Sequence, residues 1–231
     1  MNKNKKEKGI EENTSPKTVN TERELHLRKA ECFQKKISEV TKANDPSILS
    51  ICFDYQKNLP VPVTNIGDEY YLRQLWIYNL GIHCLTTRKA NMYMYAKHFA
   101  RKGPNKVITC LQDYITQNKK PEQRILQLFC DNSFNQNKNR FVFVSLNQVC
   151  ANNIFETIEI WYPVPGHSMM PVDRDFAVIE KQRLKRDNVD NPEVLLGHGQ
   201  EKREKEEDVD ILASQVENQV GGKRIRCNRR G

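Results

Sequence analysis

The sequence predicts an α/β fold with a mixed sheet, in which three antiparallel strands are followed by alternating helices and parallel strands. Two observations predict this class. Three apolar, β-rich runs follow one another in the first half of the core, which is typical of an antiparallel meander. In the second half, amphipathic segments alternate with short apolar runs, and this order adds parallel strands to a sheet through crossover helices.

The chain divides into a central domain and two polar ends. Residues 1–22 and 189–231 are rich in charged and amide side chains, so we expect a disordered basic and polar arm at one end and a disordered charged tail at the other. Residues 23–188 hold the tryptophans, tyrosines and phenylalanines. This segment is long enough to bury one core.

The first half of the domain is predicted to contain a leading helix and then strands. The helix is expected over 23–43, with Thr21 and Glu24 placed as a capping box at its start. The strands are expected at 47–56, 74–85 and 91–98. Residues 59–63, LPVPV, predict an extended connector that pairs poorly, because proline cannot donate a hydrogen bond to a sheet.

The second half is predicted to alternate between helices and strands. The expected elements are helix 105–117, strand 124–130, helix 136–150, strand 154–161 and helix 173–186. The first of these helices has its apolar residues on one face. Residues 141–146, FVFVSL, also have strand character, and periodicity does not decide between helix and strand there.

Charge and cysteine content limit the class of partner and compartment. A net charge of +8 is compatible with a polyanion such as DNA, since lysine and arginine gain affinity by counterion release. The seven cysteines form no Cys-x-x-Cys pair, which favours reduced thiols over disulfides or a zinc site. We expect a nuclear protein, otherwise a cytoplasmic one, with no membrane segment and no small-molecule substrate. The sequence does not indicate an oligomeric state.

Acidic residues stand at the ends of two predicted strands. Asp54 follows the apolar part of the first strand, and Asp131 ends the strand at 124–130. Chemistry in open α/β sheets gathers at the carboxyl ends of strands, so both carboxylates would share a cleft if the strands are neighbours. Mg²⁺ or Mn²⁺ would relieve their repulsion. Asp173 or Asp175, in the last helix, would supply a third acid.

A structural interpretation of the same residues stands beside this one. An aspartate after a strand is a common turn or cap residue, so Asp131 would simply begin a turn. Asp173 would then cap the last helix, and Asp175 would complement the helix dipole. His167, in an irregular loop, contacts a phosphate or metal on the first interpretation and is structural on the second.

Four sequence blocks occur within residues 25–188 in the order CFDYQKNLPVP, YYLRQLWIYNLGIH, FCDNSFNQNKNR and YPVPGHSMMPVDRDFAVIEK. Together they resemble an uncharacterised family, abundant in arthropods, that is understood to derive from the catalytic domain of cut-and-paste DNA transposases. The resemblance implies an RNase H-like fold with a three-acid (DDE/DDD) metal site. It makes Asp54 and Asp131 the first two acids and places the third at Asp173 or Asp175, with Asp175 preferred.

The resemblance also implies a wall of polar residues that faces DNA. These residues are Gln136, Asn137, Lys138, Asn139, Arg140, His167 and Arg174. The implied cofactor is Mg²⁺ or Mn²⁺, the implied partner is DNA, and the implied reaction is two-metal-ion phosphodiester cleavage or strand transfer.

Two departures from the family pattern favour a different hypothesis. The third strand of the family commonly carries a glutamate where this chain has Lys97. Relatives also have an upstream cysteine-rich segment and further structure after the position of Asn188, so a shortened copy is expected. A catalytically inactive, domesticated DNA-binding or protein-interaction module is therefore the alternative to an active transposase or nuclease.

Overall fold

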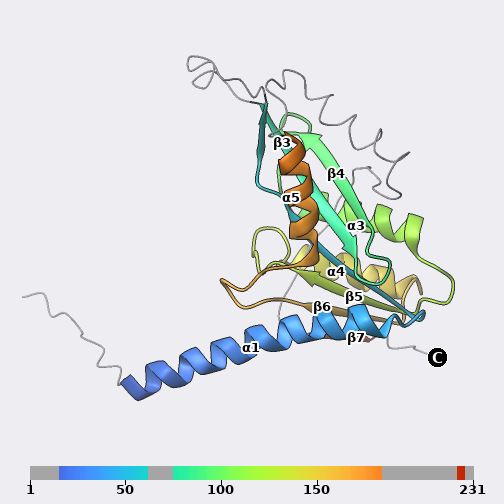
Figure 1. Cartoon of the computed structure of the whole chain (residues 1–231). Helices are drawn as coiled ribbons and strands as arrows, with labels where there is room; N and C mark the ends of the chain where they lie inside the picture. Colours follow the sequence, from blue (N-terminus) through green and yellow to red (C-terminus); the bar gives the residue numbers. More distant parts are fainter. Residues whose placement is uncertain (1–15, 62–74, 184–222, 227–231) are drawn as a thin grey trace, which may run out of the picture.

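The computed structural model describes residues 16–61, 75–183 and 223–226 (Figure 1). The helices are α1 (Pro16–Ala43), α3 (Pro104–Asn118), α4 (Arg140–Ala151) and α5 (Pro171–Arg183). The strands are β1 (Ile48–Tyr55), β2 (Leu59–Val61), β3 (Leu75–Cys84), β4 (Ala90–Ala96), β5 (Ile125–Cys130), β6 (Thr157–Trp161) and β7 (Lys223–Arg226). No helix of these ranges is both long and apolar enough to cross a membrane.

The strand β1 lies inside the sheet and connects its two halves. It pairs antiparallel with β3 and parallel with β5. On one side β3 pairs antiparallel with β4, and on the other β5 pairs parallel with β6. The order β4–β3–β1–β5–β6 confirms the predicted fold class, a meander followed by helix-linked parallel strands, and agrees with an RNase H-like α/β fold.

Two short strands extend the sheet beyond the prediction. The segment predicted as a poorly paired connector contains β2, which pairs antiparallel with β3 through Leu59 and Ile77. That part of the prediction was wrong, because a proline within a short edge strand leaves the pairing of its neighbours intact. β7 pairs antiparallel with β6 and lies in the segment predicted as a charged tail. The rest of that tail and residues 1–15 of the arm predicted at 1–22 are outside the described residues. Residues 16–22 of that arm are not disordered, because they belong to α1.

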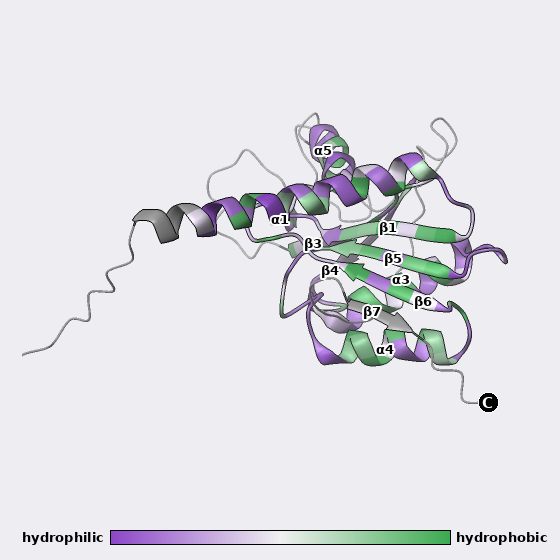
Figure 2. Ribbon diagram, turned by 90° about the horizontal axis from the view of Figure 1, so that it is seen from below, coloured by the Kyte–Doolittle hydropathy of each residue, from purple (hydrophilic) through white to green (hydrophobic). Residues whose placement is uncertain are grey.

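The two faces of the sheet carry separate cores. Side chains alternate along each strand, so Phe53 and Leu128 face α3 and α4, whereas Cys52 and Phe129 face α1 and α5. On the second face, the ring of Phe33 from α1 meets Phe129 edge-on, with centroids 5.9 Å apart. Figure 2 shows α1 and α4 on opposite sides of the strands.

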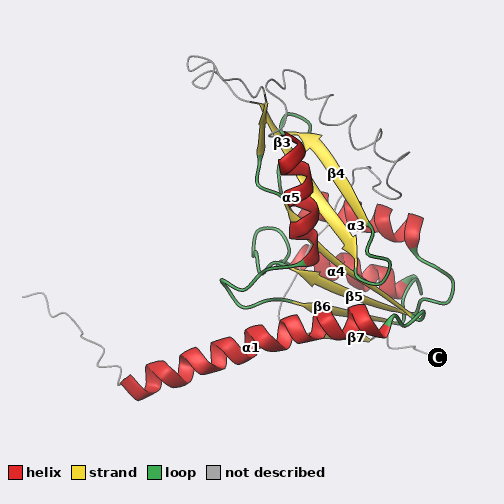
Figure 3. Ribbon diagram, in the orientation of Figure 1, coloured by secondary structure: helices red, strands yellow, loops and turns green. Residues whose placement is uncertain are grey.

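The predicted helices are present with shifted boundaries. The segment FVFVSL is helical and belongs to α4, which begins at Arg140 instead of residue 136. Asn139 sets this start, because its side chain accepts a hydrogen bond from the N–H of Phe141 at 3.2 Å. The last helix begins at Pro171 rather than at Asp173. Figure 3 shows the loops that leave β5 and β6, in green, beside the start of α5.

Candidate active site at the carboxyl ends of two parallel strands

The structure brings Asp54 and Asp131 together at one edge of the sheet. Phe53 and Cys130 are partners in the parallel pair of β1 and β5. Asp54 and Asp131 are the next residue on each chain segment. Because the two strands run in the same direction, both carboxylates stand at the carboxyl ends of neighbouring strands.

Asp54 lies on the face of the sheet that α5 covers. Its cross-strand partner is Gly81 of β3, and a Cβ placed at Gly81 would meet Val172 and Phe176 of α5. Cross-strand partners point to the same face. The side chain of Asp54 therefore points toward the helix that carries Asp173 in its first turn.

Burial is the main influence on the carboxyl groups at this edge, and neighbouring carboxylates add to it. Burial raises the pKa of Asp54 to about 7, and the carboxylates of Asp131 and Asp173 contribute to the rise. The N–H of Tyr55, which donates to Oδ1 of Asp54 at 2.7 Å, opposes it, as does the ammonium of Lys102. Burial also raises the pKa of Asp131. A cation at this edge would stabilise the ionised carboxylates.

Lys102 is held near Asp54 by a backbone carbonyl and two aromatic rings. Its Nζ donates to the carbonyl oxygen of Gln56 at 2.8 Å, and it lies 4.8 Å from the ring centroid of Tyr55 and 5.4 Å from that of Tyr78. Burial lowers the pKa of Lys102, and Asp54 raises it. Sequence reasoning missed this residue, because nothing local distinguishes Lys102 from the cations around it.

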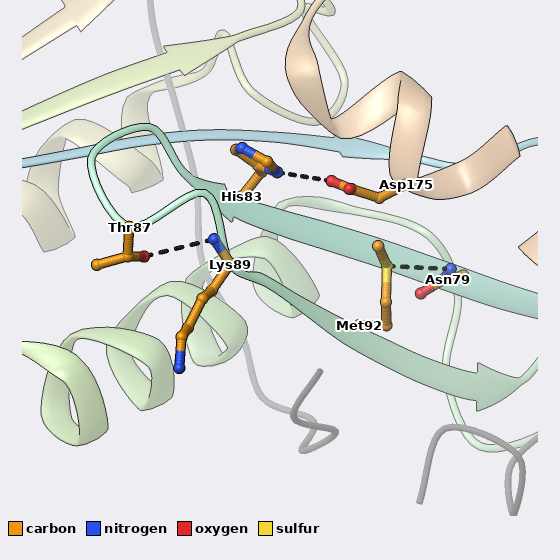
Figure 4. A network of polar contacts seen from close by, with 6 residues as sticks. All are labelled: Asn79, His83, Thr87, Lys89, Met92 and Asp175. Atoms are coloured by element: carbon orange, nitrogen blue, oxygen red, sulfur yellow. Dashed lines mark hydrogen bonds and ion pairs between the residues drawn. The ribbon is translucent and has the colours of Figure 1, made fainter. Parts of the chain in front are cut away.

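The two candidates for the third acid have different partners. Oδ2 of Asp173 accepts a hydrogen bond from the N–H of Met170 at 2.7 Å. Asp173 is the third residue of α5, so it bonds back to the residue before the helix, as in a capping box, and is not the N-cap residue that the structural interpretation predicted. Oδ2 of Asp175 lies 2.8 Å from Nδ1 of His83 on β3 (Figure 4). Residues two apart on a helix are separated by about 200° around its axis. Of the pair, Asp173 is the one whose charge raises the pKa of Asp54.

The loop at 131–139, named here the amide loop, is organised around a buried asparagine. Asn137 is only 2% exposed, and its Nδ2 donates to the carbonyl oxygen of Asp131 at 3.4 Å. The backbone carbonyl oxygen of Asn137 accepts a hydrogen bond from the hydroxyl of Tyr162 at 3.1 Å. Within the described part of the chain, the buried Oδ1 atoms of Asn132 and Asn137 have no hydrogen-bond partner. Such orphaned oxygens are uncommon and call for an explanation such as an ion.

The other residues predicted to contact DNA have varied surroundings. Arg140 and Arg174 are exposed, and Gln136 and Lys138 are partly buried. Asn139 caps α4. The ring of His167 lies 5.2 Å from that of His26 on α1, so this loop histidine contacts the leading helix.

Lys97, the departure from the family pattern, lies away from the acids. Asp54 is level with Gly81 on β3 and with Met92 on β4. Lys97 follows the last residue of β4, five positions beyond Met92. Its side chain is exposed.

The oxygen donors at this edge are of the type that binds a hard cation, but too few of the described side chains converge to form a complete metal site. Carboxylate and amide oxygens are the ligands that Mg²⁺ and Mn²⁺ prefer, and the orphaned oxygens of Asn132 and Asn137 stand beside Asp131. Across the ranges that the structure describes, however, no three His, Cys, Asp or Glu side chains converge on a point where they could hold a metal. The donor types fit such an ion, with Asp54 and Asp131 at the ends of neighbouring strands.

Comparison with protein families identifies a match over most of the domain. The model of a family described as a domain of unknown function, DUF7869, matches residues 68–220. This range includes Asp131, Asp173 and Asp175, whereas Asp54 precedes it. No curated protein matches the chain, and no solved structure does.

Proposed function

The chain belongs to the DUF7869 family, and we propose that its domain is a transposase-derived, RNase H-like nuclease that cleaves or transfers DNA strands with Mg²⁺ or Mn²⁺. One observation carries this proposal. Asp54 and Asp131 follow partner residues of two parallel strands, and the start of α5 adds Asp173 to the electrostatics of Asp54.

The residues of the chain would divide the work as follows. Asp54 and Asp131 would hold the divalent ion, and Asp173 would complete the acidic set. When bound, the ion supplies Lewis-acid stabilisation of the phosphate and lowers the pKa of a water or hydroxyl nucleophile. Lys102 favours the ionised form of Asp54, since it lowers the pKa of that carboxyl.

The structure supports Asp173 over Asp175 as the third acid. The carboxylate of Asp175 is paired with the side chain of His83 at 2.8 Å. Asp173 accepts from the N–H of Met170 through Oδ2 and interacts electrostatically with Asp54. The net charge of +8 supports DNA as the partner, and with it a nuclear location.

The test is nicking of supercoiled DNA by the full chain, with Mg²⁺ or with EDTA. We expect metal-dependent nicking that is lost in Asp54→Asn and Asp131→Asn. Asp45→Asn is the matched control, because Asp45 is an exposed carboxylate that bonds the N–H and hydroxyl of Ser47. Metal-dependent nicking that survives Asp131→Asn would refute the proposal.

A DNA-binding module without catalysis is the second candidate. The finding in its favour is that the described side chains do not form a group of three metal ligands. DNA binding that weakens with salt, is unchanged by EDTA and is accompanied by no nicking would support this function. Metal-dependent cleavage that requires Asp54 would exclude it.

A further inference from the structure

Phe134 is a large apolar side chain on the surface of the amide loop, three residues after Asp131. Its side chain is 67% exposed. Single exposed apolar residues are common on protein surfaces and need no explanation by themselves. Two further features of the loop distinguish Phe134 from such residues.

The first feature is that the amide loop is internally bonded. The carbonyl oxygen of Ser133 accepts hydrogen bonds from the N–H groups of Gln136, Asn137 and Lys138, at 3.3, 2.9 and 2.8 Å. Buried Asn137 ties the same loop back to the carbonyl of Asp131. Phe134 is therefore presented to solvent by a bonded turn, which lowers the conformational entropy that a ligand must remove on binding.

The second feature is a cation over one face of the ring. Nζ of Lys138 lies 4.6 Å from the ring centroid of Phe134 and 5.8 Å from that of Tyr162. An exposed aromatic ring with an adjoining ammonium is the combination that single-stranded nucleic acids use, since bases stack on the ring and the cation meets the phosphate. In a duplex the faces of the bases are already stacked on one another, so the ring of Phe134 cannot stack on a base.

We infer that Phe134 stacks on an unpaired nucleobase and that Lys138 contacts a neighbouring phosphate, so that nucleic acid is single-stranded where it passes Asp131. This inference rests on the proposed function, in which DNA binds at the edge formed by Asp54 and Asp131. It adds the substrate class: a strand with at least one unpaired base beside the cleavage site.

The experiment compares the affinities of the full chain for a labelled 20-nucleotide single strand and for the same sequence as a duplex. Fluorescence anisotropy in EDTA measures binding without cleavage. We expect a preference for the single strand. Phe134→Ala should weaken single-strand binding at least about fivefold, the loss typical of one stacked base, and leave duplex binding unchanged.

Four further variants make the result specific. Phe134→Trp should keep the affinity, because it keeps a stacking surface, whereas Phe134→Leu should bind as weakly as Phe134→Ala. Phe99→Ala is the matched control, because Phe99 is 75% exposed and has the ring of His98 at 4.2 Å, but it follows no acidic residue. Lys138→Gln should reduce the slope of log affinity against log salt for the single strand by about 0.7.

Single-strand affinity within twofold of wild type in Phe134→Ala would overturn the inference, and so would wild-type affinity in Phe134→Leu. An equal loss in Phe99→Ala would overturn it as well, since it would indicate a general effect of surface apolarity. The two proposals fail separately. Stacking-dependent binding without nicking contradicts the proposed function alone, and metal-dependent nicking without the Phe134 effect contradicts this inference alone.

Discussion

Asp54 on β1 and Gly81 on β3 are cross-strand partners, and Gly81 is the point where α5 rests on the sheet. A Cβ at position 81 would lie 2.6 Å from Cε1 of Phe176 and 2.7 Å from Cγ2 of Val172. The missing side chain therefore lets α5 pack against the sheet beside Asp54. The same contact determines how near Asp173, in the first turn of α5, lies to Asp54.

Gly81→Ala should destabilise the domain and move α5 outward. Overpacking of this kind costs about 1–3 kcal/mol, and urea denaturation measures it. Gly103→Ala is the control, since nothing lies within 4 Å of a Cβ at that position and its φ of 174° is extended. We expect a change within about 0.5 kcal/mol for the control. Equal effects of the two substitutions would contradict the packing argument.

Asp54→Asn should stabilise the metal-free protein, and increasingly so as pH rises. The pKa of Asp54 in the folded protein, about 7, lies above its ordinary value of 3.8. The folded protein therefore loses stability as the pH rises from about 4 to about 7, because the buried carboxyl resists ionisation more than it does in the unfolded chain. The gain from asparagine should grow between about pH 4 and 7 and then level off, at on the order of 2–4 kcal/mol.

Urea denaturation in EDTA at pH 4, 5.5 and 8 tests this dependence. Asp45→Asn should show no such gain, because the hydrogen bonds from Ser47 lower the pKa of Asp45. A stabilisation by Asp54→Asn that is the same at all three pH values would show that Asp54 is not an acid with a raised pKa.

Lys102→Met should raise the pKa of Asp54 further, because it removes the ammonium that lowers it. A divalent ion needs the ionised carboxylate, so the pH at which Mg²⁺ begins to raise the melting temperature should move upward. Lys106→Met is the matched control, since Nζ of Lys106 also lies over a tyrosine ring, 5.6 Å from the centroid of Tyr95. The ¹³C chemical shift of the Asp54 carboxyl measures the pKa directly, and equal values in both variants would contradict the assignment.

Asp173→Asn and Asp175→Asn should separate catalysis from packing. Asp173→Asn should reduce nicking at least about a hundredfold while the fold persists, in line with the loss of a metal ligand. Asp175→Asn should retain nicking and lose about 1–2 kcal/mol of stability, because it weakens the contact with His83. The opposite pattern, with nicking lost only in Asp175→Asn, would restore the preference that the sequence resemblance indicates.

Much of the fold follows from the local sequence. The parts that could not be predicted from it depend on contacts between elements that are distant in the chain. The elements at 48–55, 75–84 and 125–130 were predicted within a few residues, because strand periodicity is a local property. β2 was missed because the prolines in LPVPV, of which Pro60 lies in the strand, argue against pairing, and only the position of β3 beside it shows that pairing occurs. The helix starts at Arg140 because Asn139 caps it. The sequence has several other amide residues nearby that could serve as the cap, so it does not identify the start.

The sequence by itself determined the α/β class and singled out Asp54, Asp131 and the pair Asp173 and Asp175, since each marks the end of a strand or the start of a helix. Only the tertiary structure shows that Asp54 and Asp131 follow partner residues of neighbouring parallel strands. The parallel register of β1 and β5, the close approach of α5 over Gly81 and the placement of Lys102 join residues far apart in the chain. Such contacts arise from packing between elements, and a local sequence pattern does not predict that packing.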